Sequence, residues 1–174
     1  MRYGAFFLAG FVLMIIQANL FRVIQWIHVP GLVPSLALPL VVYMGVREYP
    51  LAKGAATAFA LGYGTDLIGM SPVGLYTFTY VGLYVLARTA GVRFAAQTIW
   101  MQLGLGFGFA ALESVTVLVL LAIFGKDPYV PRTLYPMALP HVLATAALSP
   151  LLFRLARFLE NRTARSEAAG GAPR

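Results

Sequence analysis

The 174-residue sequence has no cysteine and few charged side chains, and each shortage excludes a class of protein. Without cysteine, disulfides, thiolate metal sites and thiol catalysis are excluded. Charged residues make up 11% of the chain and apolar residues 60%, with a mean hydropathy of +0.79. A soluble domain carries roughly 25% charged and 45–50% apolar residues. A water-soluble fold of this size could not bury so much apolar surface, so the sequence predicts an integral membrane protein.

The apolar residues form long continuous blocks, which indicates helices and not the alternating strands of a membrane barrel. Within lipid, only helices satisfy the backbone hydrogen bonds of such blocks. We therefore predict an all-α integral membrane protein, a bundle of six transmembrane helices in residues 1–158, followed by a disordered, basic tail in residues 159–174. The helices are expected at about residues 3–21, 32–46, 51–68, 72–87, 97–124 and 134–158. The second and third are short for a hydrocarbon core of about 30 Å.

The 13 basic residues predict the orientation, because they gather on the cytoplasmic side of membrane proteins. In this topology the cytoplasmic side receives ten of them: Arg2, Arg47, Lys53, Arg88, Arg93, Arg154, Arg157, Arg162, Arg165 and Arg174. The outer side receives Arg22, Lys126 and Arg132. Both termini are thus expected in the cytoplasm. Topology accounts for the positive charge, so we expect contacts with membrane lipids and none with nucleic acid.

Small residues recur at helical spacing in three of the predicted helices. Such rows let another helix approach closely in lipid, where no hydrophobic force drives helices together. The pattern fits both packing within the bundle and binding of a partner helix, and alone it leaves both interpretations open. One row is Ala52, Ala56, Ala60 and Gly64, beside a second of Ala58, Gly62 and Asp66; the others are Gly104 with Gly108, and Gly74 with Gly82 around Phe78.

Glu113 lies midway along the fifth predicted helix, where a carboxylate costs about 3 kcal/mol to insert. Helical spacing aligns it with Gln102 and Thr116, so this polar face should point into the bundle. One interpretation is a ligand or proton site. The other is an internal hydrogen-bonded clamp whose partners are drawn from Gln17, His141 and Thr145.

A second carboxylate, Asp66, ends the third predicted helix near the outer interface, in the stretch GYGTDLIGMSPVGLY. There it can accept hydrogen bonds from the free backbone amides that begin the next helix. Ser71 and Pro72 are typical of an N-cap followed by proline at the first helical position. Gly74 then permits a tight approach. We expect a short, rigid turn held by its own aspartate.

A small six-helix membrane protein with this G-x-x-x-D segment and S-P-x-G turn resembles the rod shape-determining MreD family. The matching positions are Gly62, Asp66, Ser71, Pro72 and Gly74. The resemblance implies a non-enzymatic scaffold in the bacterial inner (cytoplasmic) membrane, without cofactor or metal, that binds MreC. It also implies association with the glycan polymerase RodA, its penicillin-binding transpeptidase partner and the MreB filament, and so regulation of peptidoglycan synthesis in cell elongation.

Two other functions compete with this one. The family fold is similar to the substrate-binding subunits of energy-coupling-factor vitamin transporters, and Glu113 with His141 could line a vitamin pocket. The external loops, however, offer few polar groups for such a ligand. An intramembrane enzyme, such as a lipid transferase, would need a paired nucleophile and base, and the sequence shows no such pair.

Overall fold

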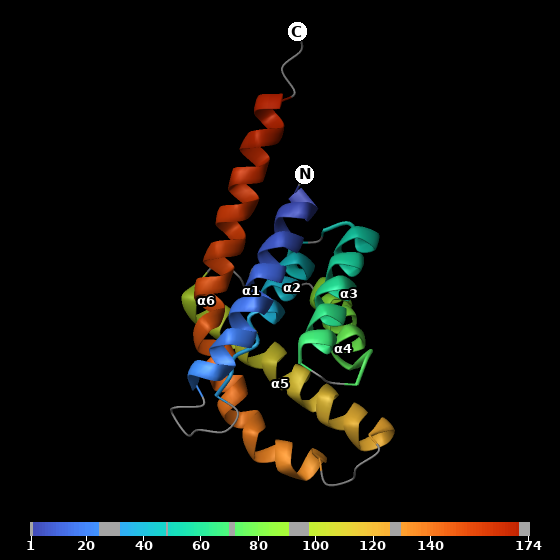
Figure 1. The fold of residues 1–174 in the computed structure, drawn as a ribbon. Coiled ribbons are helices and arrows are strands. Elements are labelled where there is room, and N and C mark those ends of the chain that lie inside the picture. Colours follow the sequence, from blue (N-terminus) through green and yellow to red (C-terminus); the bar gives the residue numbers. More distant parts are fainter. Residues whose placement is uncertain are drawn as a thin grey trace.

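The computed structural model describes residues 2–24, 32–47, 49–69, 72–90, 98–125 and 130–170. Within these ranges the chain forms six α-helices and no strand, so the predicted all-α class is confirmed (Figure 1). The helices are α1 (Arg2–Ile24), α2 (Ala37–Val46), α3 (Leu51–Ile68), α4 (Leu75–Thr89), α5 (Ile99–Phe124) and α6 (Val130–Gly170).

Two of the helices in the described ranges are long and apolar enough to cross a membrane: α5 and the part of α6 from Tyr135 to Thr163. Only 22% of the most apolar window of α5 is buried within the protein. Its outward side carries large apolar side chains such as Trp100 and Phe124, which are 80% and 77% exposed. An apolar helix with so little of its surface covered is suited to contact with lipid.

The second predicted helix is shorter than expected. Residues 32–35 are not helical, and α2 has ten residues, or about 15 Å, roughly half of a hydrocarbon core. The two prolines explain the late start. Pro34 disfavours helical geometry at Val33, and Pro39 has no amide hydrogen, which a helix tolerates only in its first turn. Alone, α2 is therefore too short to span a membrane.

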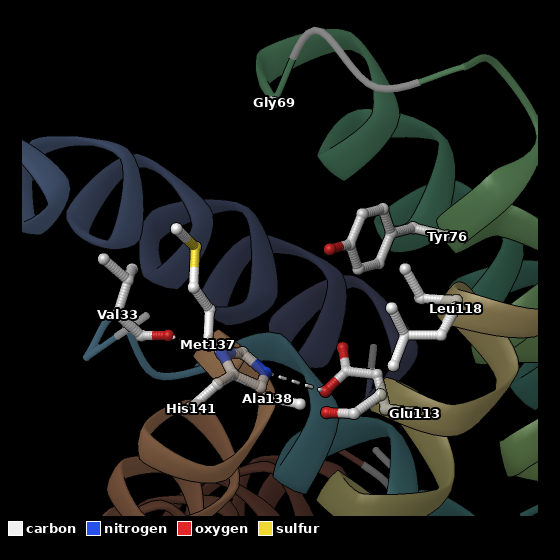
Figure 2. A pocket seen from close by; sticks show the side chains of 10 residues that line it. Val33, Gly69, Tyr76, Glu113, Leu118, Met137, Ala138 and His141 are labelled. Carbon is white, nitrogen blue, oxygen red and sulfur yellow. Dashed lines mark hydrogen bonds and ion pairs between the residues drawn. The ribbon is translucent and has the colours of Figure 1, made fainter. Parts of the chain in front are cut away.

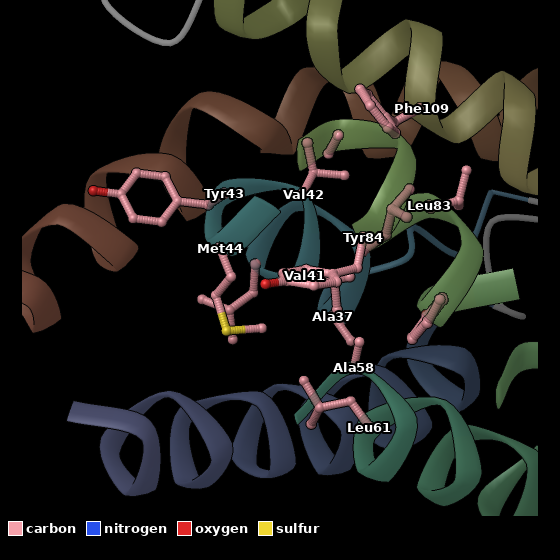
Figure 3. Close-up of a cluster of buried hydrophobic side chains, with 14 of the residues drawn as sticks. Ala37, Val41, Val42, Tyr43, Met44, Ala58, Leu61, Leu83, Tyr84 and Phe109 are labelled. Carbon is pink, nitrogen blue, oxygen red and sulfur yellow. The ribbon is translucent and has the colours of Figure 1, made fainter. Parts of the chain in front are cut away.

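This short helix is the centre of the fold. All its residues are buried, and α2 contacts each of the other helices. Around it, α3 packs along α4 and α5 packs along α6. Figure 3 shows the resulting core, in which side chains of α2 meet those of α3, α4 and α5: Val41, Val42, Tyr43 and Met44 with Ala58, Leu61, Leu83, Tyr84 and Phe109.

The last helix, α6, continues well beyond the predicted end of the membrane segment. The sequence predicted disorder from residue 159, whereas α6 is helical through Gly170. Two contacts to the end of α2 support this extension: Tyr43 donates a hydrogen bond of 2.6 Å to Glu160, and Arg47 lies 3.4 Å from the same carboxylate. The start of α1 and the end of α6 lie at the same end of the bundle, where α6 projects past its neighbours (Figure 1).

Candidate functional site

The turn between α3 and α4 is built around the buried carboxylate of Asp66, which is 1% exposed. Its Oδ2 accepts hydrogen bonds from the amides of Gly74 (2.9 Å) and Thr77 (3.2 Å) and from the Thr77 hydroxyl (2.7 Å). Its Oδ1 accepts from the amide of Tyr76 at 2.8 Å. Asp66, in the last turn of α3, thus caps the start of α4, as its position in the sequence predicted. A negative charge is also favourable at a helix N-terminus.

The helix itself starts later than predicted. The prediction that Ser71 caps α4 and Pro72 is its first residue is wrong for Pro72, which lies outside the helix, while Ser71 falls outside the described residues. Gly74 is the N-cap instead, in a left-handed conformation with φ of 102°. Because Asp66 already satisfies the amides of the first turn, the chain needs no hydroxyl cap. It needs a residue that tolerates positive φ, and glycine does.

Below this turn, α3 and α4 approach each other at Gly62. A Cβ atom on Gly62 would lie 2.6 Å from the Cα of Thr77 and 2.7 Å from the carbonyl oxygen of Tyr76. No side chain fits against a backbone at that distance. The row of Ala58, Gly62 and Asp66 is buried, so it packs within the molecule. The first motif glycine and the aspartate therefore belong to one structural unit.

The second buried carboxylate is Glu113, also 1% exposed, on the inward face of α5 that carries the buried Gln102 and the half-buried Thr116. Its Oε1 accepts a hydrogen bond of 3.1 Å from the Ser35 hydroxyl, and its Oε2 lies 3.4 Å from Nε2 of His141. The hydroxyl of Ser35 also lies 3.0 Å from that of Tyr80. Since Ser35 gives its only hydroxyl hydrogen to Glu113, Tyr80 donates to Ser35.

The remaining polar groups hold the chain just before α2. The amide of Ser35 donates to Thr145 at 3.0 Å, and the amide of Leu36 donates to Gln17 at 2.9 Å. Of the three predicted partners, His141 is therefore the one that contacts Glu113. Gln17 and Thr145 instead satisfy backbone amides at the start of the short helix. These amides lack helical partners, so side chains must supply the acceptors.

The tautomer of His141 follows from its neighbours. Nδ1 lies 2.6 Å from the carbonyl oxygen of Val33, which can only accept, so Nδ1 carries a hydrogen. Nε2 faces the carboxylate of Glu113, and a hydrogen bond between them requires one more hydrogen. This hydrogen resides either on an imidazolium or on a carboxylic acid. A hydrogen bond along this contact, which Figure 2 shows as a dashed line, thus requires that Glu113 and His141 share one proton.

Two residues of this network were not predicted. Ser35 directly precedes the apolar run of α2, and a serine in that position is a known helix-start signal that could have drawn attention to it. Tyr80 carries no comparable signal, because α4 contains three tyrosines and the sequence does not show which of them faces Glu113.

A cavity of about 430 Å³ adjoins the pair of Glu113 and His141, between α4, α5, α6 and the segment before α2. A second cavity of about 360 Å³ shares Val33 and Gly69 with the first. Within the described ranges, no three His, Asp or Glu side chains gather as metal ligands would.

The other small-residue rows lie toward the surface. Ala52 and Ala56 are exposed, whereas Ala60 is half-buried and Gly64 packs against Met14 of α1. Gly104 is exposed and Gly108 half-buried, and no atom lies within 4 Å of where a Cβ would stand on either. The α5 row and the first half of the α3 row are thus open faces of the molecule.

The opposite end of the bundle from the Asp66 turn is basic. Arg88 donates a hydrogen bond to the carbonyl oxygen of Tyr49, and Arg47 contacts both Tyr43 and Glu160. The hydrogen bond with Tyr43 raises the pKa of Arg47 above its ordinary value, so this guanidinium remains charged.

Comparisons of the chain with protein-family models, with curated proteins and with solved structures gave no match.

Proposed function

We propose that this chain is a non-enzymatic scaffold and regulator of the bacterial cell-elongation machinery, embedded in the inner membrane and binding MreC. In this proposal the chain crosses the membrane six times with both termini in the cytoplasm, and α2 with the segment before it forms one of the crossings. Binding of MreC outside and of MreB-associated proteins inside would couple peptidoglycan synthesis to the filament.

The arrangement of the motif residues supports the proposal. Gly62, Asp66 and Gly74 act together, since Gly62 brings α3 against α4, Asp66 caps α4, and Gly74 turns the chain. Each of these three residues thus has a distinct structural task in the turn. This arrangement gives the resemblance to MreD proteins a physical basis.

The observation that carries the proposal is the open glycine face of α5. We define this face by Gly104 and Gly108, which have free space where a Cβ would be. Exposed apolar side chains continue it along the helix: Met101, Leu112, Val115 and Val119. In lipid, a partner helix gains binding energy chiefly by close backbone packing, and glycines at this spacing provide it. A single transmembrane helix of MreC is a suitable occupant.

Crosslinking in native membranes tests this proposal. The wild-type chain should recover MreC, and changing Gly104 and Gly108 together to leucine should lower the recovery about tenfold or more, because bulky side chains keep the two backbones apart. Gly82→Leu is the matched control, since Gly82 is equally open but lies on α4.

Three outcomes would count against the proposal. Unchanged recovery of MreC from the double leucine variant would exclude the α5 face as the binding site for MreC. Recovery of an ATPase with a coupling subunit would favour a transporter subunit. If rod-shaped cells keep their shape after depletion of this protein, a function in cell elongation is excluded.

A further inference from the structure

The cavity beside Glu113 has the size and lining of a small-molecule site. Its volume of about 430 Å³ lies within the range of roughly 300–1,000 Å³ found for ligand pockets. The walls are mostly apolar and include Val117, Leu118 and Met137, while a few polar groups converge on the space. Figure 2 shows the Glu113 carboxylate and the Tyr76 ring facing this space from α5 and α4.

The charge of the site favours a cationic ligand. None of the described residues that line the cavity is lysine or arginine. The contact from His141 to Oε2 of Glu113 is long, at 3.4 Å, so a cation that approaches Oε2 more closely can take its place. The Tyr76 ring adds an electron-rich surface of the kind that attracts organic cations.

We propose that this cavity binds a small molecule carrying an ammonium group, which Glu113 holds through Oε2 while Tyr76 and the apolar walls contact its organic part. The proposal is independent of the scaffold function, because it concerns the interior of the bundle and not the α5 face.

Binding of the cation exchanges one positive charge for another. The groups that face Glu113 are His141 from α6, Tyr76 from α4, and Tyr80 from α4 through Ser35. When the ammonium group takes the place of His141 at Oε2, the proton that the pair shares leaves to water and His141 remains neutral, with its Nδ1 hydrogen still on Val33. Binding should therefore release a proton.

The experiment is calorimetric titration of the full chain, purified in detergent, with choline and with ethanolamine. The neutral control is 3,3-dimethylbutanol, which has the shape of choline without its charge. We expect saturable binding of at least one of the two cations, no saturable binding of the alcohol, and a heat that varies with the ionisation enthalpy of the buffer. An equal response to the alcohol would overturn the proposal.

Two variants then locate the site. Glu113→Gln should weaken cation binding about tenfold or more, because it removes the charged acceptor. Glu160→Gln is the matched control, since it makes the same change in a carboxylate held by Tyr43 and Arg47. If Glu113→Gln does not accumulate, Ala138→Phe decides, because Ala138 lines the cavity and a phenyl group there would take up space beside Glu113. Cation binding with wild-type affinity in either variant overturns the proposal.

Native mass spectrometry distinguishes a free amine from a lipid headgroup. The ammonium group would belong to a lipid if the wild type and Glu160→Gln retain phosphatidylethanolamine and Glu113→Gln does not. If Glu113→Gln does not accumulate, Ala138→Phe takes its place in this comparison. Soluble cations that bind without any retained lipid would assign it to a free amine. If the protein retains no phosphatidylethanolamine and binds neither choline nor ethanolamine, the proposal is overturned.

Discussion

Asp66 and Glu113 are equally buried, each 1% exposed, yet their partners come from different parts of the chain. All four donors to Asp66 belong to Gly74 and the first turn of α4, at most 11 residues away. Glu113 is bound instead by Ser35 and His141, which are 78 and 28 residues away. The first carboxylate therefore fixes a local turn, whereas the second links three separate segments beside a cavity. Equal burial does not imply an equal role.

Replacing Asp66 by alanine should have the largest effect on stability. The change leaves the amides of Gly74, Tyr76 and Thr77 without their acceptor, and we expect a loss of about 3–5 kcal/mol in the free energy of unfolding. The thermal unfolding midpoint in detergent and the amount of protein in membranes measure this loss.

Thr77→Val is the control for that experiment, because it removes only the hydroxyl bond to Asp66 and keeps the three amide bonds. We expect a loss of about 1 kcal/mol. Equal unfolding midpoints for Asp66→Ala and Thr77→Val would show that Asp66 does not hold the turn.

The close approach of the helices at the Asp66 turn gives the second prediction. Gly62→Ala places a Cβ against the backbone of Thr77 and should destabilise the protein by about 1–2 kcal/mol, even after the better helix propensity of alanine. Gly104→Ala, on the open face of α5, should stabilise it by up to about 1 kcal/mol. Unfolding midpoints that shift in the same direction would refute the packing at Gly62.

The difference between the two carboxylates also explains what could be predicted from the sequence. The role of Asp66 was predictable because its partners follow it closely in the chain, although the start of α4 was misplaced: the pattern Ser71-Pro72 is typical of a helix start, and only the folded turn shows that Asp66 replaces a hydroxyl cap. For Glu113, burial followed from helical spacing. Its contact with Ser35 joins residues 78 apart, and no local pattern encodes it.

The same reasoning applies to the two helices whose lengths were wrong. Residues 32–46 are apolar except for Ser35, so hydropathy extended α2 over a segment in which Pro34 and Pro39 disfavour a helix. Residues 159–170 are polar, so their composition indicated disorder, whereas Tyr43 holds Glu160 across 117 residues. Hydropathy describes the surroundings of a segment and does not determine its conformation.

A matched pair of amide substitutions tests the comparison directly. In Asp66→Asn, the amide oxygen can keep the three hydrogen bonds made at Oδ2, but the amino group then faces the Tyr76 amide and cannot accept from it. We therefore expect a loss of about 2 kcal/mol, smaller than that of Asp66→Ala. In Glu113→Gln, the amide oxygen still accepts from Ser35 and the amino group can donate to a neutral His141, so we expect a loss of about 1 kcal/mol. Unfolding midpoints measure both.

Recovery of MreC is a second measurement for the variants Asp66→Asn and Glu113→Gln. If Glu113→Gln keeps its level in membranes and its recovery of MreC, neither the charge of Glu113 nor a charge-dependent clamp is needed for assembly. Equal destabilisation by the two amide variants would contradict the distinction between a local cap and a long-range link.

The smallest expected effect concerns Tyr80, which reaches Glu113 only through Ser35. Tyr80→Phe removes the hydroxyl that donates to Ser35 and keeps the buried ring, so the loss should be about 0.5–1 kcal/mol. Because Ser35 joins Tyr80 to Glu113, the losses in Tyr80→Phe and Glu113→Gln should not add when the two are combined. Tyr43→Phe, which affects Glu160 and shares no partner with Tyr80, should add to Tyr80→Phe within about 0.5 kcal/mol. Additive losses in both double variants, measured by thermal unfolding, would show that Ser35 does not transmit changes at Tyr80 to Glu113.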